Sequence, residues 1–352
     1  MPPRPPPPRS KGCFLSFWTY HASIFIKNIL EWHGLNPVIF GRSQINIFTH
    51  FFMNIKTVCL FYGVNRNLTT LFSSLLSLHP NCQVLNHSSK VILADKKNFL
   101  KIRTQENLQK FIDFAIKASK KNIKGVGGSI TSSHAFTKSF SSSEISQRYQ
   151  TRFGDTQVKG QINSLVWKDA THMTAYLEDN KISALQVAAD YPEVRFILPI
   201  RNLVDCILSN ITKHQGDWGA NSHQETAEVI VRRTQEFLDM EKQCPHQFMH
   251  FFQDEIDEDF INRLAAFLDL NATPEWKRDF LDCYKLKPSD GATIELKNTY
   301  GDMIKKYLSN SPYIKKFEAF AEQIPTVASV GVVAFIAISK ITQDFYYEQL
   351  LA

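Results

Sequence analysis

The sequence lacks the patterns that mark several common classes of site. Its six cysteines include no CxxC pair and no Cys/His cluster at metal-ligand spacing, which argues against a zinc site and predicts mostly buried thiols in a reducing compartment. No run of about 20 apolar residues is present, so a membrane-spanning helix is not expected. The 40 basic and 34 acidic residues leave a formal net charge of +6, which is mild for 352 residues. This charge argues against a dedicated nucleic-acid binder and suits an anionic ligand.

The first residues have the composition of a disordered extension. Six of the first nine are proline and two are arginine, a mixture that cannot form a packed core. We interpret residues 1–52 as a poorly structured extension and residues 53–352 as the folded domain of a cytoplasmic protein. The alternative is a membrane anchor at residues 14–26, a thirteen-residue apolar run that follows positive charges but is short for a spanning helix. A second short apolar run, 327–338, is expected to be a buried helix or strand.

From Met53 onward, short apolar runs alternate with amphipathic stretches, which is the pattern of a parallel α/β sheet. The expected strands are 57–62, 82–86, 165–167, 194–200 and 248–252. The expected helices are 69–78, 104–120, 202–213, 225–242 and 260–270, and a further helical stretch reaches Ala189. The pattern predicts a three-layer α/β/α fold around a central parallel sheet, with ligands bound beyond the carboxyl ends of the strands.

Two smaller features refine this expectation. Pro199 cannot donate a hydrogen bond to a neighbouring strand and should therefore lie at the end of its own strand. The glycine- and serine-rich residues 125–146 are expected to form a flexible loop or lid.

The segment YGVNRNLTTL, residues 62–71, lies between a predicted buried strand and a predicted helix. A loop in this position presents unpaired backbone N–H groups and the positive end of the helix dipole, so it can hold a phosphate. Arg66 adds a fixed charge, and Thr69 and Thr70 add hydroxyl donors. The glycine-lysine-serine/threonine ending of a Walker A loop is absent, which disfavours nucleoside triphosphate hydrolysis and a P-loop kinase.

A second segment, RFILPIRNLVDCILSN at residues 195–210, joins the strongest strand signal to a helix. Arg201 lies where the strand ends, and Ser209 lies two helical turns further on. The guanidinium can bind a phosphate bidentately, and the serine can add a hydroxyl hydrogen bond. The alternative is that Arg201 forms an ion pair with Asp205 and that Ser209 occupies an ordinary helix face.

Together these segments resemble the sulfotransferase family. YGVNRNLTTL is similar to its 5′-phosphosulfate loop, and RNLVDCILSN is similar to its 3′-phosphate segment, in which an Arg and a Ser stand eight residues apart. HPNCQVLNHS, LVWKDAT and FMHFFQDEIDEDFINRLAAFLDL are similar to connecting segments of bacterial-type members. The resemblance covers residues 57–270, leaves 271–352 as a C-terminal helical region, and implies a P-loop NTPase-like sulfotransferase fold.

The resemblance implies transfer of a sulfuryl group from 3′-phosphoadenosine 5′-phosphosulfate (PAPS) to a hydroxyl or amine, without a metal. Arg66 would neutralise charge that develops on the bridging and sulfuryl oxygens. The donor-binding residues that it implies are Gly63, Arg66, Asn67, Leu68, Thr69, Thr70, Arg201 and Ser209.

The general base is less clearly marked. His87 follows the second strand and so should lie at the same edge of the sheet as the loop, which makes it the candidate base. Lys168 resembles a family lysine near the sulfuryl group, and with Arg66 it completes the implied catalytic set. The alternatives are that His87 is a loop histidine without a role and that Lys168 is a strand-end lysine in solvent. His172 is a further candidate base, or otherwise a helix residue without catalytic duty.

The loop departs from the family pattern at three positions, of which Leu68 matters most. Asn65 replaces proline, Asn67 replaces serine, and Leu68 stands where the family has glycine. A leucine held at positive φ costs about 1–2 kcal/mol, so we expect either a different loop path or weaker phosphate binding.

Two hypotheses follow from this departure. One is an active sulfotransferase with a small-molecule, lipid or glycan acceptor, held by residues 125–160 and the C-terminal region. The other is a catalytically silent nucleotide-binding or interaction protein that keeps the fold.

Overall fold

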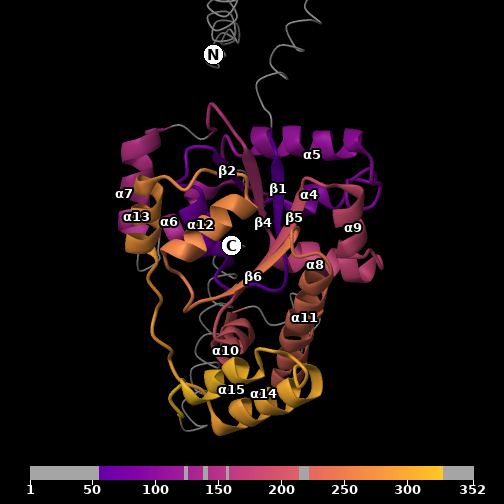
Figure 1. The fold of residues 1–352 in the computed structure, drawn as a ribbon, viewed down its shortest axis with the longest axis vertical. Helices are drawn as coiled ribbons and strands as arrows, with labels where there is room; N and C mark the ends of the chain where they lie inside the picture. Colours follow the sequence, from indigo (N-terminus) through magenta and orange to yellow (C-terminus); the bar gives the residue numbers. More distant parts are fainter. Residues whose placement is uncertain (1–54, 123–125, 138–141, 156–157, 214–221, 328–352) are drawn as a thin grey trace, which may run out of the picture. The chain divides into compact units, whose positions relative to one another are not determined.

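The computed structural model describes residues 55–122, 126–137, 142–155, 158–213 and 222–327 (Figure 1). The expected extension 1–52 with its apolar run 14–26, and all of the run 327–338 except Val327, lie outside these residues. Among the described residues, no helix is long and apolar enough to cross a membrane.

Six strands form one sheet in the order β3-β2-β4-β1-β5-β6. Their bounds are Thr57–Phe61 (β1), Cys82–His87 (β2), Gly127–Ser129 (β3), Ser164–Lys168 (β4), Val194–Ile200 (β5) and Phe248–Phe252 (β6). Five strands pair in parallel, and β3 runs antiparallel to β2 at the edge. The predicted central parallel sheet is confirmed, and β3 is an addition to it.

Helices connect the parallel strands, because a parallel pair requires a long crossover. Those up to β4 are α3 (Thr69–Leu76), α4 (Ser89–Ile92), α5 (Gln105–Ala118), α6 (His134–Thr137) and α7 (Ser142–Phe153). Between β4 and β6 lie α8 (Ala170–Asp179), α9 (Ala184–Asp190), α10 (Leu203–Lys213) and α11 (His223–Gln243). The last four are α12 (Glu258–Phe267), α13 (Pro274–Cys283), α14 (Ile294–Tyr307) and α15 (Ile314–Glu322).

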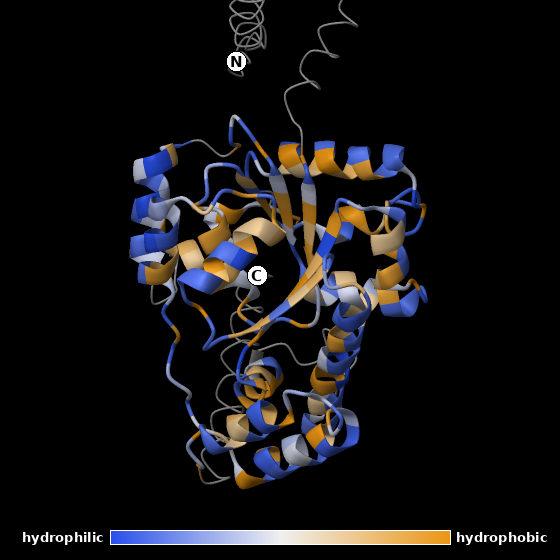
Figure 2. Ribbon diagram, in the orientation of Figure 1, coloured by the Kyte–Doolittle hydropathy of each residue, from blue (hydrophilic) through white to orange (hydrophobic). Residues whose placement is uncertain are grey.

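The central strand β1 feeds two hydrophobic cores, because successive side chains of a strand point to opposite faces of the sheet. Val58 and Leu60 pack into a core with α5, α8, α9, α10, α11, α14 and α15. Cys59 and Phe61 pack into a second core with α3, α6, α7, α12 and α13. Figure 2 shows hydrophobic strands between helices that carry both hydrophobic and hydrophilic sides. The three-layer α/β/α architecture is therefore confirmed, and it is consistent with the sulfotransferase-like fold that the sequence implies.

Helices α5 and α10 each begin with a capping side chain, and Pro199 lies where the sequence predicts. The Thr104 hydroxyl accepts a hydrogen bond from the N–H of Asn107 at the start of α5. The Asn202 side chain accepts one from the N–H of Val204 at the start of α10. Pro199 lies near the end of β5, beyond the last β5 residue that pairs with β1. The helical stretch that reaches Ala189, however, is two helices, α8 and α9, which are separated near Lys181 at φ 54°.

The expectation of a flexible loop at residues 125–146 is wrong for its described part. Residues 127–129 form β3, and α6 and α7 follow. The two glycines permit close backbone approach: a Cβ at Gly127 would lie 2.3 Å from the Asn86 carbonyl, and one at Gly128 would lie 2.1 Å from the Lys121 carbonyl. Ile145 and Tyr149 give the serine-rich helix α7 a buried apolar face. Glycine and serine here serve tight packing, which composition alone does not distinguish from flexibility.

A buried lysine anchors the carboxyl end of α3, the helix that follows the candidate phosphate loop. Lys159 is 6% exposed, and its Nζ donates hydrogen bonds to the backbone carbonyls of Ser77, His79 and Cys82. A cation at the C-terminal end of a helix complements the helix dipole. Lys159 thereby stabilises the C-terminal end of α3, and the N-terminal end of α3 adjoins the candidate phosphate loop.

Candidate active site

Four segments that the sequence singles out meet at one edge of the sheet. The loop 62–68 follows β1, His87 ends β2, Lys168 ends β4, and Arg201 follows β5. Because these strands are parallel, their carboxyl ends lie at the same edge. Such an edge is where open α/β sheets bind ligands.

The loop after β1 takes the left-handed conformation that a glycine would favour. Leu68 has φ 61° and ψ 0°, and Arg66 has φ 64°. The structure holds the leucine at positive φ, which is the strained conformation that the sequence analysis considered; weaker phosphate binding stays a prediction. Leu68 is also the N-cap of α3 and supplies no side-chain hydrogen bond to it. Strained backbone of this kind concentrates at functional sites.

The backbone amides of this loop are available to an anion. Within the described part of the chain, no group accepts a hydrogen bond from the N–H groups of residues 66–70. The first N–H groups of a helix have no partner inside the helix, and a capping side chain commonly takes one of them. Because Leu68 supplies no acceptor, the geometry leaves these donors for a phosphate, which the helix dipole also favours.

Two predicted donor-binding residues face the protein interior. Asn67 is 1% exposed, and its Oδ1 accepts a hydrogen bond of 2.8 Å from the Arg201 N–H. The Gly63 N–H donates to the Thr174 hydroxyl at 2.9 Å, and a Cβ at Gly63 would lie 2.8 Å from a Leu198 methyl carbon. Neither residue lines a cavity described below. The structure thus places both where they hold the loop in position.

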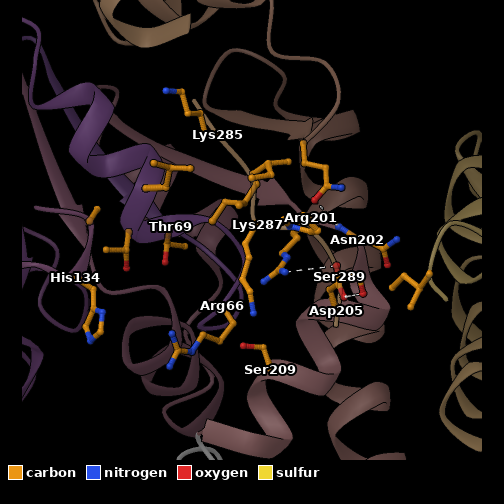
Figure 3. Close-up of a pocket in the computed structure, with 18 of the residues that line it drawn as sticks. Arg66, Thr69, His134, Arg201, Asn202, Asp205, Ser209, Lys285, Lys287 and Ser289 are labelled. Carbon is orange, nitrogen blue, oxygen red and sulfur yellow. Dashed lines mark hydrogen bonds and ion pairs between the residues drawn. The ribbon is translucent and has the colours of Figure 1, made fainter. Parts of the chain in front are cut away.

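The other six predicted donor-binding residues line one cavity of about 850 Å³, the first cavity (Figure 3). They are Arg66, Leu68, Thr69, Thr70, Arg201 and Ser209. They come from the loop, from the start of α3, from the residue after β5 and from α10. Two segments that are 130 residues apart in the sequence therefore share one cavity.

Arg201 forms the ion pair that the sequence offered as the alternative to phosphate binding, and phosphate binding stays a prediction. Its guanidinium lies 3.5 Å from an Asp205 carboxylate oxygen, and it also lines the first cavity. Asp205 accepts a second contact, a 2.5 Å hydrogen bond from the Ser289 hydroxyl. The ion pair is present, but it does not remove Arg201 from the cavity.

Part of the wall of the first cavity comes from residues that the sequence analysis did not single out. Lys285 and Lys287 follow α13, and Gln323 and Ile324 follow α15. Lys285 pairs with Glu144, and Lys287 pairs with Asp290. No local motif marks these positions, because they reach the cavity only through the C-terminal path of the chain.

A second cavity, of about 570 Å³, joins the first at the loop. The two cavities share Arg66, Thr69, Thr70 and His134. The remaining predicted catalytic residues, His87 and Lys168, line the second cavity together with Asp169 and His172. Arg66 therefore lies where the two cavities meet.

His87 and Lys168 are in direct contact. Lys168 Nζ lies 3.2 Å from His87 Nε2. Lys168 is only 6% exposed, so it is not a strand-end lysine in solvent. The pKa of Lys168 is lowered to about 8, chiefly by burial. The Asp169 carboxylate acts to raise this pKa, and the Arg66 guanidinium acts to lower it.

Asp169 is a buried carboxylate that the sequence analysis missed. It is 3% exposed, and its Oδ1 lies 2.8 Å from His172 Nδ1. Its Oδ2 lies 3.8 Å from His87 Nδ1 and has no hydrogen-bond partner. Burial acts to raise the pKa of Asp169, but the two histidines outweigh it and hold this pKa well below its usual range. The signal that could have found Asp169 is an acidic residue directly after a buried strand, in LVWKDAT.

The loop carries concentrated positive charge. Desolvation lowers the pKa of Arg66, and the charge of Arg201 lowers it further. Arg66 forms no ion pair within the described residues. An anion bound between these two guanidiniums would relieve their repulsion.

No cluster of three or more His, Cys, Asp or Glu residues that could hold a metal ion occurs in the described part of the chain. The five cysteines described there are free thiols, four of them buried. The prediction of mostly buried thiols is therefore confirmed for these five.

Comparison with known proteins gives a distant structural likeness. No protein-family model matches the chain, and no curated protein matches its sequence. A crystal structure of a sulfotransferase from Mycobacterium avium is similar to it, with 15% sequence identity and a TM-score of 0.40. The likeness covers 76% of this chain and 80% of that protein. The function proposed below rests on the geometry of the two cavities.

Proposed function

We propose that this chain is a sulfotransferase that transfers a sulfuryl group from PAPS to a hydroxyl or amine acceptor. The observation that carries the proposal is the meeting of two cavities at Arg66, Thr69 and Thr70. One cavity holds the two segments predicted to bind phosphate, and the other holds the predicted base and a buried lysine. A group-transfer enzyme needs this arrangement, in which donor and acceptor approach each other from opposite sides of the reacting centre.

The donor occupies the first cavity in this proposal. Its 5′-phosphosulfate binds the unpaired loop amides and the hydroxyls of Thr69 and Thr70. Its 3′-phosphate binds Arg201 and Ser209, and the phosphate competes with Asp205 for the guanidinium.

The acceptor enters through the second cavity and attacks sulfur in line. A bond forms between the acceptor oxygen or nitrogen and sulfur while the bond from sulfur to the 5′-phosphate oxygen breaks, which releases adenosine 3′,5′-bisphosphate. The acceptor proton goes to His87, and Arg66 stabilises the charge on the departing phosphate. In the structure Lys168 Nζ lies 3.2 Å from His87 Nε2, so a charged lysine would occupy the lone pair of this nitrogen. The nitrogen becomes available as a base when the Lys168 ammonium turns to the sulfuryl oxygens.

A second candidate function is a catalytically silent nucleotide-binding protein. Leu68 favours it, because a side chain at the αL position before α3 lines the first cavity where glycine would leave more room for a phosphate. The two candidates agree on donor binding and differ on turnover.

Donor binding is tested by the thermal shift with adenosine 3′,5′-bisphosphate. A ligand at 100 times its Kd stabilises a protein by about 2.7 kcal/mol, which is a shift of several degrees. We expect this shift in the parent and in Arg278→Ala, which changes an exposed arginine away from both cavities. We expect it to disappear in Arg201→Ala, and adenosine 5′-monophosphate should give a much smaller shift. No shift in the parent at millimolar ligand would rule out the donor site.

Turnover is tested separately with radiolabelled PAPS and a panel of hydroxyl and amine acceptors. Label transfer by the parent supports the enzyme. Binding of the bisphosphate without transfer, together with transfer by Leu68→Gly, would support the silent protein.

A further inference from the structure

The second cavity differs from an ordinary small-molecule pocket in its lining. Every described residue that lines it carries a polar or charged side chain, except Val126 and Gly127. Ligand pockets are usually lined mainly by apolar and aromatic side chains, with only a few polar groups. The first cavity follows this rule more closely, with Leu71, Leu286 and Ile324 in its wall. Polar and charged residues therefore make up most of the lining of the second cavity.

The charge of the second cavity is positive. Arg66, Lys90 and Lys168 line it, and Asp169 is the single acidic residue among its described lining residues. Asp169 is already hydrogen-bonded to His172, whereas Lys90 is exposed and pairs with no described residue. A cavity lined by charge of one sign attracts ligands of the opposite sign.

Two buried acceptors in this lining have no donor. Asn86 is 5% exposed and Asp169 is 3% exposed, and Oδ1 of the first and Oδ2 of the second make no hydrogen bond. Both residues line the cavity. A buried acceptor without a partner is costly, and the hydroxyl groups of a ligand are the donors that would satisfy it.

From these three observations we infer that the second cavity binds a hydroxyl-rich, negatively charged saccharide as the acceptor. Its hydroxyl groups donate to Asn86 and Asp169, its anionic group pairs with Lys90, and the reacting hydroxyl faces His87. The role of the saccharide as acceptor rests on the proposed function. Binding of the saccharide can be measured without any turnover. We expect phenols and long-chain alcohols to bind more weakly, because they would leave Asn86 Oδ1 and Asp169 Oδ2 without a hydrogen-bond donor.

The test measures acceptor binding by calorimetry with adenosine 3′,5′-bisphosphate at saturation. The probes are cellobiose, its uronic acid derivative glucuronyl-glucose, 4-nitrophenol and decanol. We expect glucuronyl-glucose to bind at least about fivefold tighter than cellobiose, which is the effect of one partly screened charge pair. Lys90→Gln should remove this preference, and Lys96→Gln, an exposed lysine that lines neither cavity, should keep it.

The outcomes separate the acceptor class from the reaction. Three results would each overturn the inference: 4-nitrophenol or decanol binds more tightly than the saccharides, the two saccharides bind equally, or no saccharide binds at about 10 mM. The proposed function survives any of these results if the bisphosphate still binds and label is still transferred to some acceptor. If the parent does not bind the bisphosphate, the proposed sulfotransferase function is overturned. The comparison of glucuronyl-glucose with cellobiose, repeated without bisphosphate, then still decides the ligand class of the second cavity.

Discussion

The strain at Leu68 can be measured with one pair of substitutions. Leu68→Ala and Leu68→Gly both remove the leucine side chain, so they lose the same contacts in the first cavity. They differ in the backbone, because only glycine adopts φ 61° without a steric penalty. The difference between the two variants therefore isolates the cost of a left-handed residue before α3.

The magnitude follows from two opposing contributions. A residue with a Cβ pays about 1–2 kcal/mol in the left-handed region. Glycine loses more conformational entropy on folding than alanine, which costs about 0.5–1 kcal/mol. Leu68→Gly should therefore be more stable than Leu68→Ala by about 0.5–1 kcal/mol. For a domain of this size the Tm difference is about 1–3 °C.

The assay is reversible denaturant unfolding of both variants, with Tm values from calorimetry as a second measurement. Unchanged denaturant dependence in the two variants would show that the comparison concerns the folded state. An alanine variant that is as stable as the glycine variant, or more stable, would refute positive φ at this position. The bisphosphate should bind Leu68→Gly at least as tightly as the parent, because the loop amides keep the same path.

Three further predictions concern buried charges near the site. Lys159→Met should lower the free energy of unfolding by about 3 kcal/mol, since three carbonyls lose a charged donor, whereas Lys110→Met at a surface pair should change it by about 0.5 kcal/mol or less. The pKa of Lys168 is lowered to about 8 from 10.5, so the unfolded state binds more protons between these values and the stability of the parent rises with pH there. The unfolding free energy of the parent minus that of Lys168→Met should thus increase from about pH 7 to pH 10. A difference that stays constant with pH would contradict the lowered pKa of Lys168. Asp169→Asn should lower kcat by about 10²-fold and leave the bisphosphate affinity unchanged, which kinetics and calorimetry would distinguish from a folding defect.

The sequence predicted what local chemistry determines. The alternation of apolar and polar residues is local, so it located the five parallel strands and most helices. Because parallel strands share an edge, it also implied that His87 would lie near the loop that carries Arg66, while the family resemblance placed Lys168 and Arg201 at the same site. The two adjoining cavities contain all four residues. Their roles in binding and catalysis remain predictions.

The sequence did not predict features that depend on distant packing. The walls that Lys285 and Ile324 give to the first cavity depend on where the C-terminal segments cross the sheet edge, and no short pattern encodes that path. Strand β3 at Gly127 forms because the backbone of β2 approaches it closely. The sequence did not predict this strand, because glycine is equally typical of loops. Asp169 was overlooked because its burial between two histidines is a property of the folded site.

The link between the two phosphate segments explains why Asn67 occupies a loop position without lining a cavity. Its Oδ1 accepts a hydrogen bond from the Arg201 N–H, so the residue that we propose to bind the second phosphate is held to the loop that we propose to bind the first. Asn210 adds a parallel contact, a 2.9 Å hydrogen bond from its amide to the Asn65 carbonyl. Both bonds join the loop after β1 to the segment after β5, the neighbouring strand. A ligand with two phosphates at a fixed separation requires such coupling, because an error in either segment would misplace one phosphate. The Asn67 side chain therefore supplies one of the two links, whereas the link at position 65 uses a backbone carbonyl that any residue could provide.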